Sequence, residues 1–363
     1  MHWSDRHRSW FLTRYADCEA FFRSPNLSAD RFRAGKARES ASPGRAAGPR
    51  LRTIGSDPPE HTAVRALAQR GFTAREVASL EPRVEAVTDR LLERVAGRRE
   101  LDVVADFAYP LPITVIAELF GVPEADRARF RAWSRRMAEG MDHFYSKDRG
   151  FSGADLWAYI GGLVEQRRHR PGDDLISRML EAEGDDALTP DEVAGLCTLL
   201  VFAGHETTTN LIGNGLLALL RQPEQLDALR RADAAAVRTA VEELLRYDSP
   251  AQLISRAVAV DTEIGGTPLA AGDSVVAVLG AANRDPAVFA QPDQLDLARH
   301  PNPHLAFGLG VHFCLGAALS RREAVIALPA LLQRFPTLAL AREPVWRPTS
   351  VLRGLESLPV RTG

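Results

Sequence analysis

One long apolar run, residues 188–221, constrains the fold of this chain more than any other segment. It begins with Thr189-Pro-Asp-Glu192, the pattern of a capping box with proline at the first helical position, and it ends at Gln222-Pro223. A helix of this length is about 50 Å long at 1.5 Å per residue. Because such a helix crosses an entire globular protein, we expect the other elements to pack around it.

The middle of this predicted helix contains polar residues that a buried apolar helix does not need. Gly204, Glu206 and Thr207 lie in the segment Ala203-Gly-His-Glu-Thr-Thr208. Glycine weakens a helix by about 1 kcal/mol relative to alanine, and a threonine hydroxyl can bond to the carbonyl one turn earlier. A carboxylate here is expected to have a perturbed pKa, as groups that relay protons do. These residues indicate a functional site. The zinc-protease motif H-E-x-x-H is excluded, because its second histidine is replaced by threonine.

A second segment, residues 307–316 with the sequence F-G-L-G-V-H-F-C-L-G, places Cys314 between a glycine-rich turn and an apolar, helix-forming run. The free N–H groups at a helix start lower the pKa of a thiol, so this cysteine is a candidate nucleophile or metal ligand. Gly308 allows a tight turn and close approach to a large flat group, which Phe307 can cover. A dinucleotide-binding loop is excluded because the third glycine position is Phe313. A buried structural cysteine is the remaining alternative.

The pattern F-G-x-G-x-H-x-C-x-G resembles the haem-binding loop of the cytochromes P450. The segment Ala203-Gly-His-Glu-Thr-Thr208 and the later Glu243-Leu-Leu-Arg246 are similar to two further motifs of that family. The resemblance covers nearly the whole chain and implies a mainly α fold with small peripheral β-sheets. It implies a single domain, residues 1–363, whose long central helix lies over haem b. Family members have a further helix before the first strands, so we expect this N-terminal helix region to be missing.

The resemblance also implies roles for individual residues. Cys314 becomes the thiolate ligand of the haem iron. Gly204 leaves room for dioxygen, and Glu206 and Thr207 relay protons to it. The remaining implied positions fall into three groups: cofactor-binding residues His61, Arg65, Arg256, His312, Phe307, Gly308 and Gly316; the structural triad Glu243, Arg246 and Arg299; and substrate-pocket residues Phe144, Leu200, Ala203, Ala251, Ile254, Val351 and Leu352.

The pocket candidates are apolar, so we expect a mainly hydrophobic small-molecule substrate. Residues 141–150 match the family's lid over this pocket, and residues 31–55 match a segment that covers it. The latter segment contains six arginines and one lysine, which suggests an acidic or carrier-bound substrate.

Composition narrows the cellular context. A formal net charge of −2 gives no indication of a nucleic-acid or anionic-membrane partner, and no window approaches 20 uncharged apolar residues. The three cysteines, Cys18, Cys197 and Cys314, are odd in number and widely spaced, which argues against a disulfide framework. We therefore expect a cytoplasmic protein.

The resemblance to the cytochromes P450 implies that the protein is a haem-thiolate monooxygenase. It activates O2 with two electrons and hydroxylates or otherwise oxidises its substrate in secondary metabolism. Electrons come from ferredoxin and ferredoxin reductase, with NAD(P)H as their source, because the chain has no flavin or iron–sulfur segment. Two alternatives are a peroxide-driven peroxygenase, which the acid–alcohol pair Glu206-Thr207 disfavours, and a non-catalytic haem-binding protein.

Overall fold

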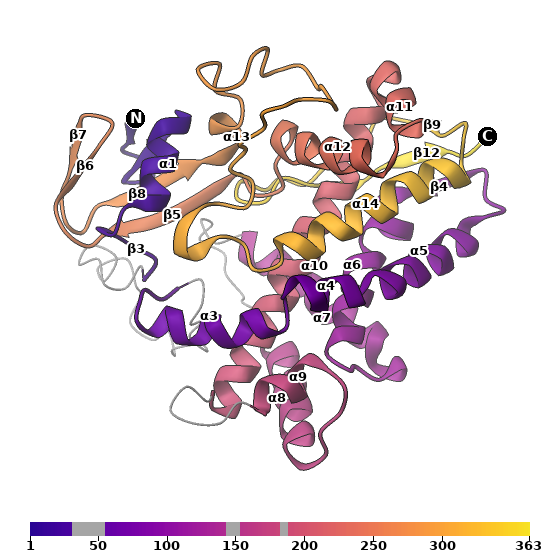
Figure 1. The fold of residues 1–363 in the computed structure, drawn as a ribbon, viewed down its shortest axis with the longest axis horizontal. Coiled ribbons are helices and arrows are strands. Elements are labelled where there is room, and N and C mark those ends of the chain that lie inside the picture. Colours follow the sequence, from indigo (N-terminus) through magenta and orange to yellow (C-terminus); the bar gives the residue numbers. More distant parts are fainter. Residues whose placement is uncertain (31–54, 143–152, 182–187) are drawn as a thin grey trace.

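The computed structural model describes residues 1–30, 55–142, 153–181 and 188–363. Its architecture is mainly helical with small β-sheets, which confirms the predicted fold class. The helix expected at residues 188–221 is α10 (Pro190–Leu220), and Figure 1 shows it running through the middle of the molecule. The predicted capping box is present. Thr189 Oγ1 accepts from the Glu192 N–H at 3.3 Å, and the Glu192 carboxylate accepts from the Thr189 N–H at 2.9 Å.

The other helices of the described residues surround α10. They are α1 (Tyr15–Arg23), α3 (Glu60–Arg70), α4 (Ala74–Ser79), α5 (Glu81–Val95), α6 (Pro110–Leu119), α7 (Arg127–Asp142), α8 (Ala154–His169), α9 (Leu175–Leu180), α11 (Pro223–Arg230), α12 (Ala234–Tyr247), α13 (Leu279–Ala282) and α14 (Ala317–Arg334). Short helical turns are η1 (Val104–Ala108), η2 (Glu124–Asp126) and η4 (Gly310–His312).

The strands form four small sheets. The largest has the order β1-β2-β8-β5-β3, in which β2 and β8 are parallel and the other neighbours are antiparallel. Its strands are β1 (His2–Ser4), β2 (Ser9–Leu12), β3 (Leu27–Ser28), β5 (Leu253–Val258) and β8 (Ser274–Val278). The others are β4 (Glu100–Asp102), β12 (Pro359–Arg361) and β9 (Ala339–Leu340); β6 (Thr262–Ile264) and β7 (Thr267–Leu269); and β10 (Val345–Trp346) and β11 (Leu355–Ser357).

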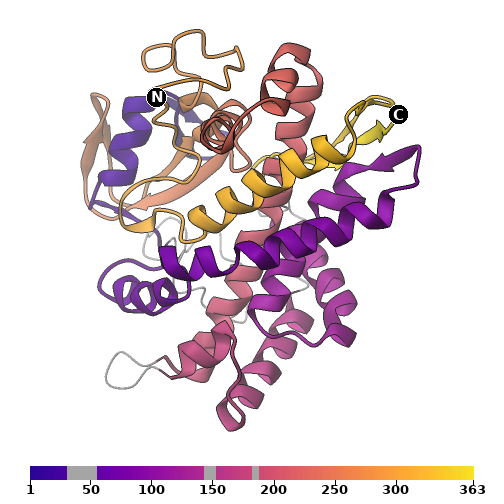
Figure 2. The ribbon, with the colours of Figure 1, turned by 45° about the vertical axis from the view of Figure 1, so that its right-hand side comes forward.

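Two clusters of buried apolar side chains hold these elements together. The larger is centred on α10, whose Leu211, Ile212 and Leu216 are at most 1% exposed, and it includes α5, α6, α12 and α14. Figures 1 and 2 show α14 lying across α10 with α5 beside it. The smaller cluster lies under the five-stranded sheet and contains Phe21 and Val275. Burying one such side chain contributes about 1.5–3 kcal/mol, so the packing around α10 fixes the helix against its neighbours.

Two local sequence patterns do not match the structure. Asp57-Pro58 has the form of an N-cap followed by proline at the first helical position, but α3 begins at Glu60 with Pro59 at the N-cap and no side-chain cap bond. The Asp57 carboxylate instead accepts from the Ser28 hydroxyl and, at 2.8 Å, from the Ala29 N–H. Residues 107–120 have the apolar character of a single helix, but the structure divides them between the π-helical turn η1 and α6. Among the described residues, no helix combines the length and apolar character that crossing a membrane requires.

Candidate active site

The Cys314 loop, residues 307–316, folds tightly just before α14. Gly308 and Gly310 have φ angles of 66° and 70°, in the left-handed region that favours glycine. A Cβ at Gly310 would lie 2.9 Å from the backbone oxygen of Phe22, so no larger residue fits without a backbone shift. The Cys314 N–H donates to the Phe307 carbonyl at 3.0 Å and closes the loop. The two glycines therefore allow the tight turn that places Cys314 three residues before the start of α14.

The electrostatics of Cys314 differ from the prediction. The thiol pKa was expected to be low, but burial raises the pKa of Cys314. The backbone groups of Gly316 and Ala317 and the charges of Arg321 and Arg65 act in the opposite direction, and burial outweighs them. A thiol in this position ionises readily only when a further cation lies next to the sulfur, as a bound metal ion does.

Phe307 is held by a network that the sequence did not reveal. The Arg321 guanidinium lies 4.4 Å from the centre of the Phe307 ring and pairs with Glu242 at 2.6 and 2.8 Å. His304 also contacts Glu242, at 3.0 Å. Burial opposes ionisation of Glu242, but the hydrogen bonds from His304 and Arg321 outweigh it and lower its pKa to about 2. The Phe307 ring is therefore held in place at the start of the Cys314 loop by Arg321, which Glu242 anchors.

Four of the predicted cofactor-binding residues form a basic cluster next to this loop. The rings of His61 and His312 are 4.1 Å apart, and Arg65 donates to the Phe313 carbonyl at 2.6 Å. Burial, and then neighbouring positive charges including Arg256, lower the pKa values of both histidines, that of His312 to about 3. His61 is 2% exposed, yet its Nδ1 has no hydrogen-bond partner in the part of the chain that the structure describes. A buried orphan donor or acceptor among cationic groups fits an anionic ligand such as a haem carboxylate.

One face of α10 remains partly open although the helix is otherwise buried. Leu200, Ala203, Gly204 and Thr207, at positions i, i+3, i+4 and i+7, are all half-buried. Thr207 donates to the Ala203 carbonyl at 2.7 Å, as the sequence indicated. A Cβ on Gly204 would lie 2.8 Å from Ile116 Cδ1, so this glycine also allows α6 to pack closely. The open face and the unfilled space beside Gly316 leave room for a flat group.

Glu206 is 3% exposed and lies between two basic side chains. Arg347, from the segment after β10, donates to Oε1, and His205 Nε2 lies 3.4 Å from Oε2. Arg347 could not be identified as a partner from the sequence, because 141 residues separate it from Glu206. The carboxyl group of Glu206 is one residue before Thr207 in the sequence and is buried beside the helix. The perturbed pKa expected for Glu206 stays a prediction.

The predicted structural triad is brought together in the interior. Arg246 donates to Glu243 at 2.7 and 2.8 Å, and Arg299 reaches the same carboxylate at 3.1 Å. Arg246 also donates to backbone carbonyls, including those of Asn283 and Pro292 at 2.9 and 2.8 Å. The triad therefore ties α12 to the segment that leads into the Cys314 loop.

Several predicted pocket residues lie near one another. Ala251 and Leu352 form an isolated antiparallel bridge, and the Gln252 N–H donates to the Val351 carbonyl at 2.8 Å. Ile254 is half-buried on β5 and packs against the smaller cluster. Phe144, like most of the predicted lid and the arginine-rich segment, lies outside the described residues.

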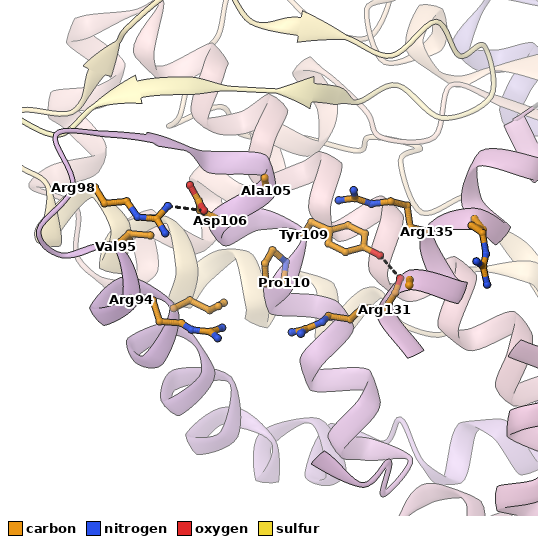
Figure 3. Close-up of a pocket in the computed structure, with 12 residues that line it drawn as sticks. Arg94, Val95, Arg98, Ala105, Asp106, Tyr109, Pro110, Arg131 and Arg135 are labelled. Carbon is orange, nitrogen blue, oxygen red and sulfur yellow. Dashed lines mark hydrogen bonds and ion pairs between the residues drawn. The ribbon is translucent and has the colours of Figure 1, made fainter. Parts of the chain in front are cut away.

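A separate cavity of about 660 Å³ lies between α5, η1, α6 and α7. Figure 3 shows its lining, in which Tyr109 and several arginines border the same hollow. Arg98 pairs with Asp106 at 2.9 Å, and the Tyr109 hydroxyl donates to the Arg131 carbonyl at 2.8 Å. No residue of the Cys314 loop lines this cavity, so it is distinct from the candidate active site.

Comparisons with known proteins agree with this geometry. A family model described as Cytochrome P450 matches residues 162–351. Cytochrome P450 107B1 of Saccharopolyspora erythraea is 42% identical over 98% of this chain and 89% of its own. Cytochrome P450 monooxygenase PikC of Streptomyces venezuelae is 41% identical over 97% of this chain and 85% of its own.

A solved structure extends the agreement to three dimensions. P450BioI, in complex with an acyl carrier protein ligated to hexadec-9Z-enoic acid, superimposes with a TM-score of 0.88 at 37% identity. The match covers 98% of this chain and 92% of that one. The chain therefore belongs to the cytochrome P450 family, whose members are haem-dependent oxidoreductases.

Proposed function

We propose that this protein is a haem-thiolate monooxygenase that uses haem b and O2 to hydroxylate or otherwise oxidise a mainly hydrophobic molecule in secondary metabolism. The observation that carries the proposal is the basic cluster beside the Cys314 loop. Among the described residues, Nδ1 of buried His61 has no hydrogen-bond partner, and Asp57 is the negatively charged neighbour of the cluster that His61 forms with Arg65, Arg256 and His312. Haem carboxylates provide such partners, and the nearby thiol provides an iron ligand.

The residues of this chain have separable tasks in that reaction. Bound haem supplies the reductive activation of dioxygen and the oxidation of the substrate. Cys314 holds the iron, and Phe307 covers the sulfur and excludes water from it. Thr207, anchored to the Ala203 carbonyl, places a hydroxyl group on the open face of α10. Glu206, buried and held by Arg347, supplies the carboxyl group one residue earlier.

The electrons for this reaction come from a separate ferredoxin and ferredoxin reductase, with NAD(P)H as the source. A ferredoxin-type cluster needs four cysteine ligands, and this chain has three cysteines in total. Cys18 and Cys197 are buried far from Cys314 in the sequence, so neither favours a cluster of its own. The family as a whole relies on redox partners, and we propose the ferredoxin type here.

The substrate is proposed to be apolar, because the open face of α10 presents Leu200 and Ala203 and the half-buried Ile254 on β5 is also apolar. A carrier-bound acyl chain is a second candidate form. The solved complex of P450BioI with a loaded acyl carrier protein supports this form, as do the arginines within residues 31–55. Parallel turnover assays with a free fatty acid and with the same acyl group on a carrier protein distinguish the two forms.

The decisive experiment is the carbon monoxide difference spectrum of the reduced protein. We expect an absorption band at about 450 nm in the parent and in the control variant Cys197→Ala, and its loss in Cys314→Ala. A band at 450 nm that persists in Cys314→Ala contradicts the ligand assignment.

Turnover with ferredoxin, reductase and NAD(P)H, compared with turnover with hydrogen peroxide alone, then separates a monooxygenase from a peroxygenase. A protein that binds haem but turns over in neither assay is a non-catalytic haem protein.

A further inference from the structure

His205 connects α7 to the carboxyl group of Glu206. Its side chain is 0% exposed, and its Nδ1 lies 2.7 Å from the Val201 carbonyl oxygen one turn earlier on α10. The Ser134 hydroxyl, on α7, lies 3.1 Å from Nδ1 and 3.3 Å from Nε2. The Nε2 atom also lies 3.4 Å from Glu206 Oε2. Each ring nitrogen therefore has a polar neighbour although the ring is shielded from solvent.

These contacts determine where the ring carries its proton. A carbonyl oxygen only accepts hydrogen bonds, so the short contact with Val201 requires a proton on Nδ1. Burial lowers the pKa of His205 to about 4, and the charges of Arg347 and Arg135 act in the same direction. The ring is therefore neutral at pH 7, and its Nε2 presents a lone pair to Ser134 and Glu206.

The lone pair on Nε2 gives the two oxygens of Glu206 different surroundings. Arg347 donates to Oε1, where it stabilises a negative oxygen. His205 Nε2 lies 3.4 Å from Oε2, close enough to accept a proton that reaches this oxygen. Either group can therefore carry a proton that enters the pair, and Arg347 stabilises the carboxylate of Glu206 once the proton has moved.

We propose that His205 is a positioning residue for Glu206, with which it exchanges one proton between Nε2 and Oε2. In one direction the O–H bond at Oε2 breaks and an N–H bond forms at Nε2, which leaves an imidazolium next to a carboxylate. The reverse transfer restores the neutral pair. This inference rests on the proposed function, in which Glu206 and Thr207 supply protons for dioxygen activation.

The groups around the ring explain why the exchange stays local. Arg347 approaches from the segment after β10, Arg135 from α7, and the Tyr109 ring, at the start of α6, packs edge-on at 5.5 Å. The positive charges of Arg347 and Arg135 disfavour an imidazolium ring at His205 unless Glu206 becomes ionised at the same moment. Tyr109 and Arg135 also line the cavity in Figure 3, and the Tyr109 ring contacts His205.

The tautomer is the first test, and it does not depend on turnover. We would label the histidine side chains with ¹⁵N in the reduced, carbon-monoxide-bound holoenzyme, which is diamagnetic, and assign His205 by the signal missing in His205→Gln. We expect a neutral ring with the proton on Nδ1 at pH 7, and an Nε2 signal that shifts in Glu206→Gln. A proton on Nε2 at pH 7, or an Nε2 signal unaffected by Glu206→Gln, overturns the inference.

The second test measures product formed per NAD(P)H consumed between pH 6 and 8. His205→Phe keeps the ring shape without nitrogen, and we expect about tenfold lower coupling and a changed pH profile, an effect smaller than the roughly 100- to 10,000-fold that a directly acting acid–base group contributes. His205→Gln keeps a polar atom near Nε2 but cannot exchange a proton. We expect partial recovery of coupling together with a larger solvent isotope effect.

The outcomes separate this inference from the proposed function. If Glu206→Gln leaves coupling unchanged in an active parent, the proton-supply role in the proposed function fails. If Glu206→Gln lowers coupling and His205→Phe, with a normal carbon monoxide spectrum, keeps the parental pH profile, only the role of His205 fails. A purely structural histidine lowers thermal stability in both His205 variants without changing the pH profile, and this result also overturns the inference.

Discussion

Glu323, on α14, is a buried carboxyl group outside the proposed reaction. Its side chain is 2% exposed, and its Oε1 atom has no hydrogen-bond partner among the described residues. Burial raises the pKa of Glu323 to about 8, and a hydrogen bond from Thr208 only partly opposes this effect. The folded protein therefore holds a neutral acid at pH 7, where the same group in the unfolded chain is ionised.

This raised pKa makes stability depend on pH in a defined direction. A group with a raised folded-state pKa stabilises the fold fully below its unfolded pKa, near 4.5, and this contribution is lost as pH rises towards about 8. The variant Glu323→Gln removes the ionisable group, so we expect it to be about 1–3 kcal/mol more stable than the parent at pH 7. Urea unfolding of both proteins at pH 5 and pH 8 checks this, with Glu343→Gln as an exposed control. Equal pH dependence in parent and Glu323→Gln contradicts the raised pKa.

At the scale of the element, α10 combines a packed side with an open side. Gly204 belongs to the open face by its spacing, yet a Cβ there would meet Ile116 Cδ1 at 2.8 Å. Packing against α6 and room for a ligand are therefore two separate reasons for glycine at this position. Alanine in its place gains about 1 kcal/mol of helix propensity but loses about 1–3 kcal/mol by overpacking.

A double-mutant cycle distinguishes these reasons, because Ile116→Val removes the Cδ1 atom that Gly204→Ala would meet. We expect Gly204→Ala to destabilise the parent by about 1 kcal/mol and to stabilise the Ile116→Val protein, as measured by urea unfolding. Coupling of NAD(P)H to product is measured in the same four proteins. If Gly204→Ala destabilises both backgrounds equally, the contact with Ile116 is not the cause. If coupling falls in both backgrounds, the room for dioxygen is a second requirement.

The contacts that residue spacing predicted are those whose partners are near in the chain, whereas Arg299 and the basic cluster were predicted from the family resemblance. Thr189 and Glu192 lie within one helical turn, as do Glu243 and Arg246, so spacing alone indicated their contacts. The partner of Glu206 could not be inferred in this way, because Arg347 is 141 residues away and only the tertiary fold brings it to α10.

Partners that are distant along the chain also explain which features were wrongly predicted or missed. Asp57 has the right position for an N-cap, but Ser28 and Ala29, about 28 residues earlier, compete successfully for its carboxylate. The contact of Arg321 with Glu242 spans 79 residues and was not predicted. For Cys314, the helix-start effect was correctly identified, but its burial depends on the whole fold and has the larger effect on the thiol pKa.

At the scale of the whole molecule, the candidate haem site lies where the two apolar clusters meet. His61 and Arg65 are on α3, whose Val64 belongs to the larger cluster, whereas Arg256 is on β5, whose Val258 belongs to the smaller one. The Cys314 loop contacts both clusters through different residues. Positive side chains from elements of the two clusters therefore lie at one site, and a cofactor with two carboxylates, bound as proposed, would link them.

Removing haem should weaken the sheet cluster more than the helical core. Without haem carboxylates, Arg65, Arg256 and the two histidines lose the anions that compensate their burial, and the space next to the Cys314 loop loses its contacts. We expect amide exchange in β5 and β8 to become at least about tenfold faster in the apoprotein, while the buried half of α10 around Ile212 changes little. Hydrogen-exchange mass spectrometry of holoprotein and apoprotein measures this. The variant Arg256→Gln serves as a control, because it removes one of the facing charges and should reduce the difference. A uniform acceleration across β5, β8 and α10 would mean that haem stabilises one cooperative unit, as the prediction of a single domain over residues 1–363 implies, rather than a junction between two clusters.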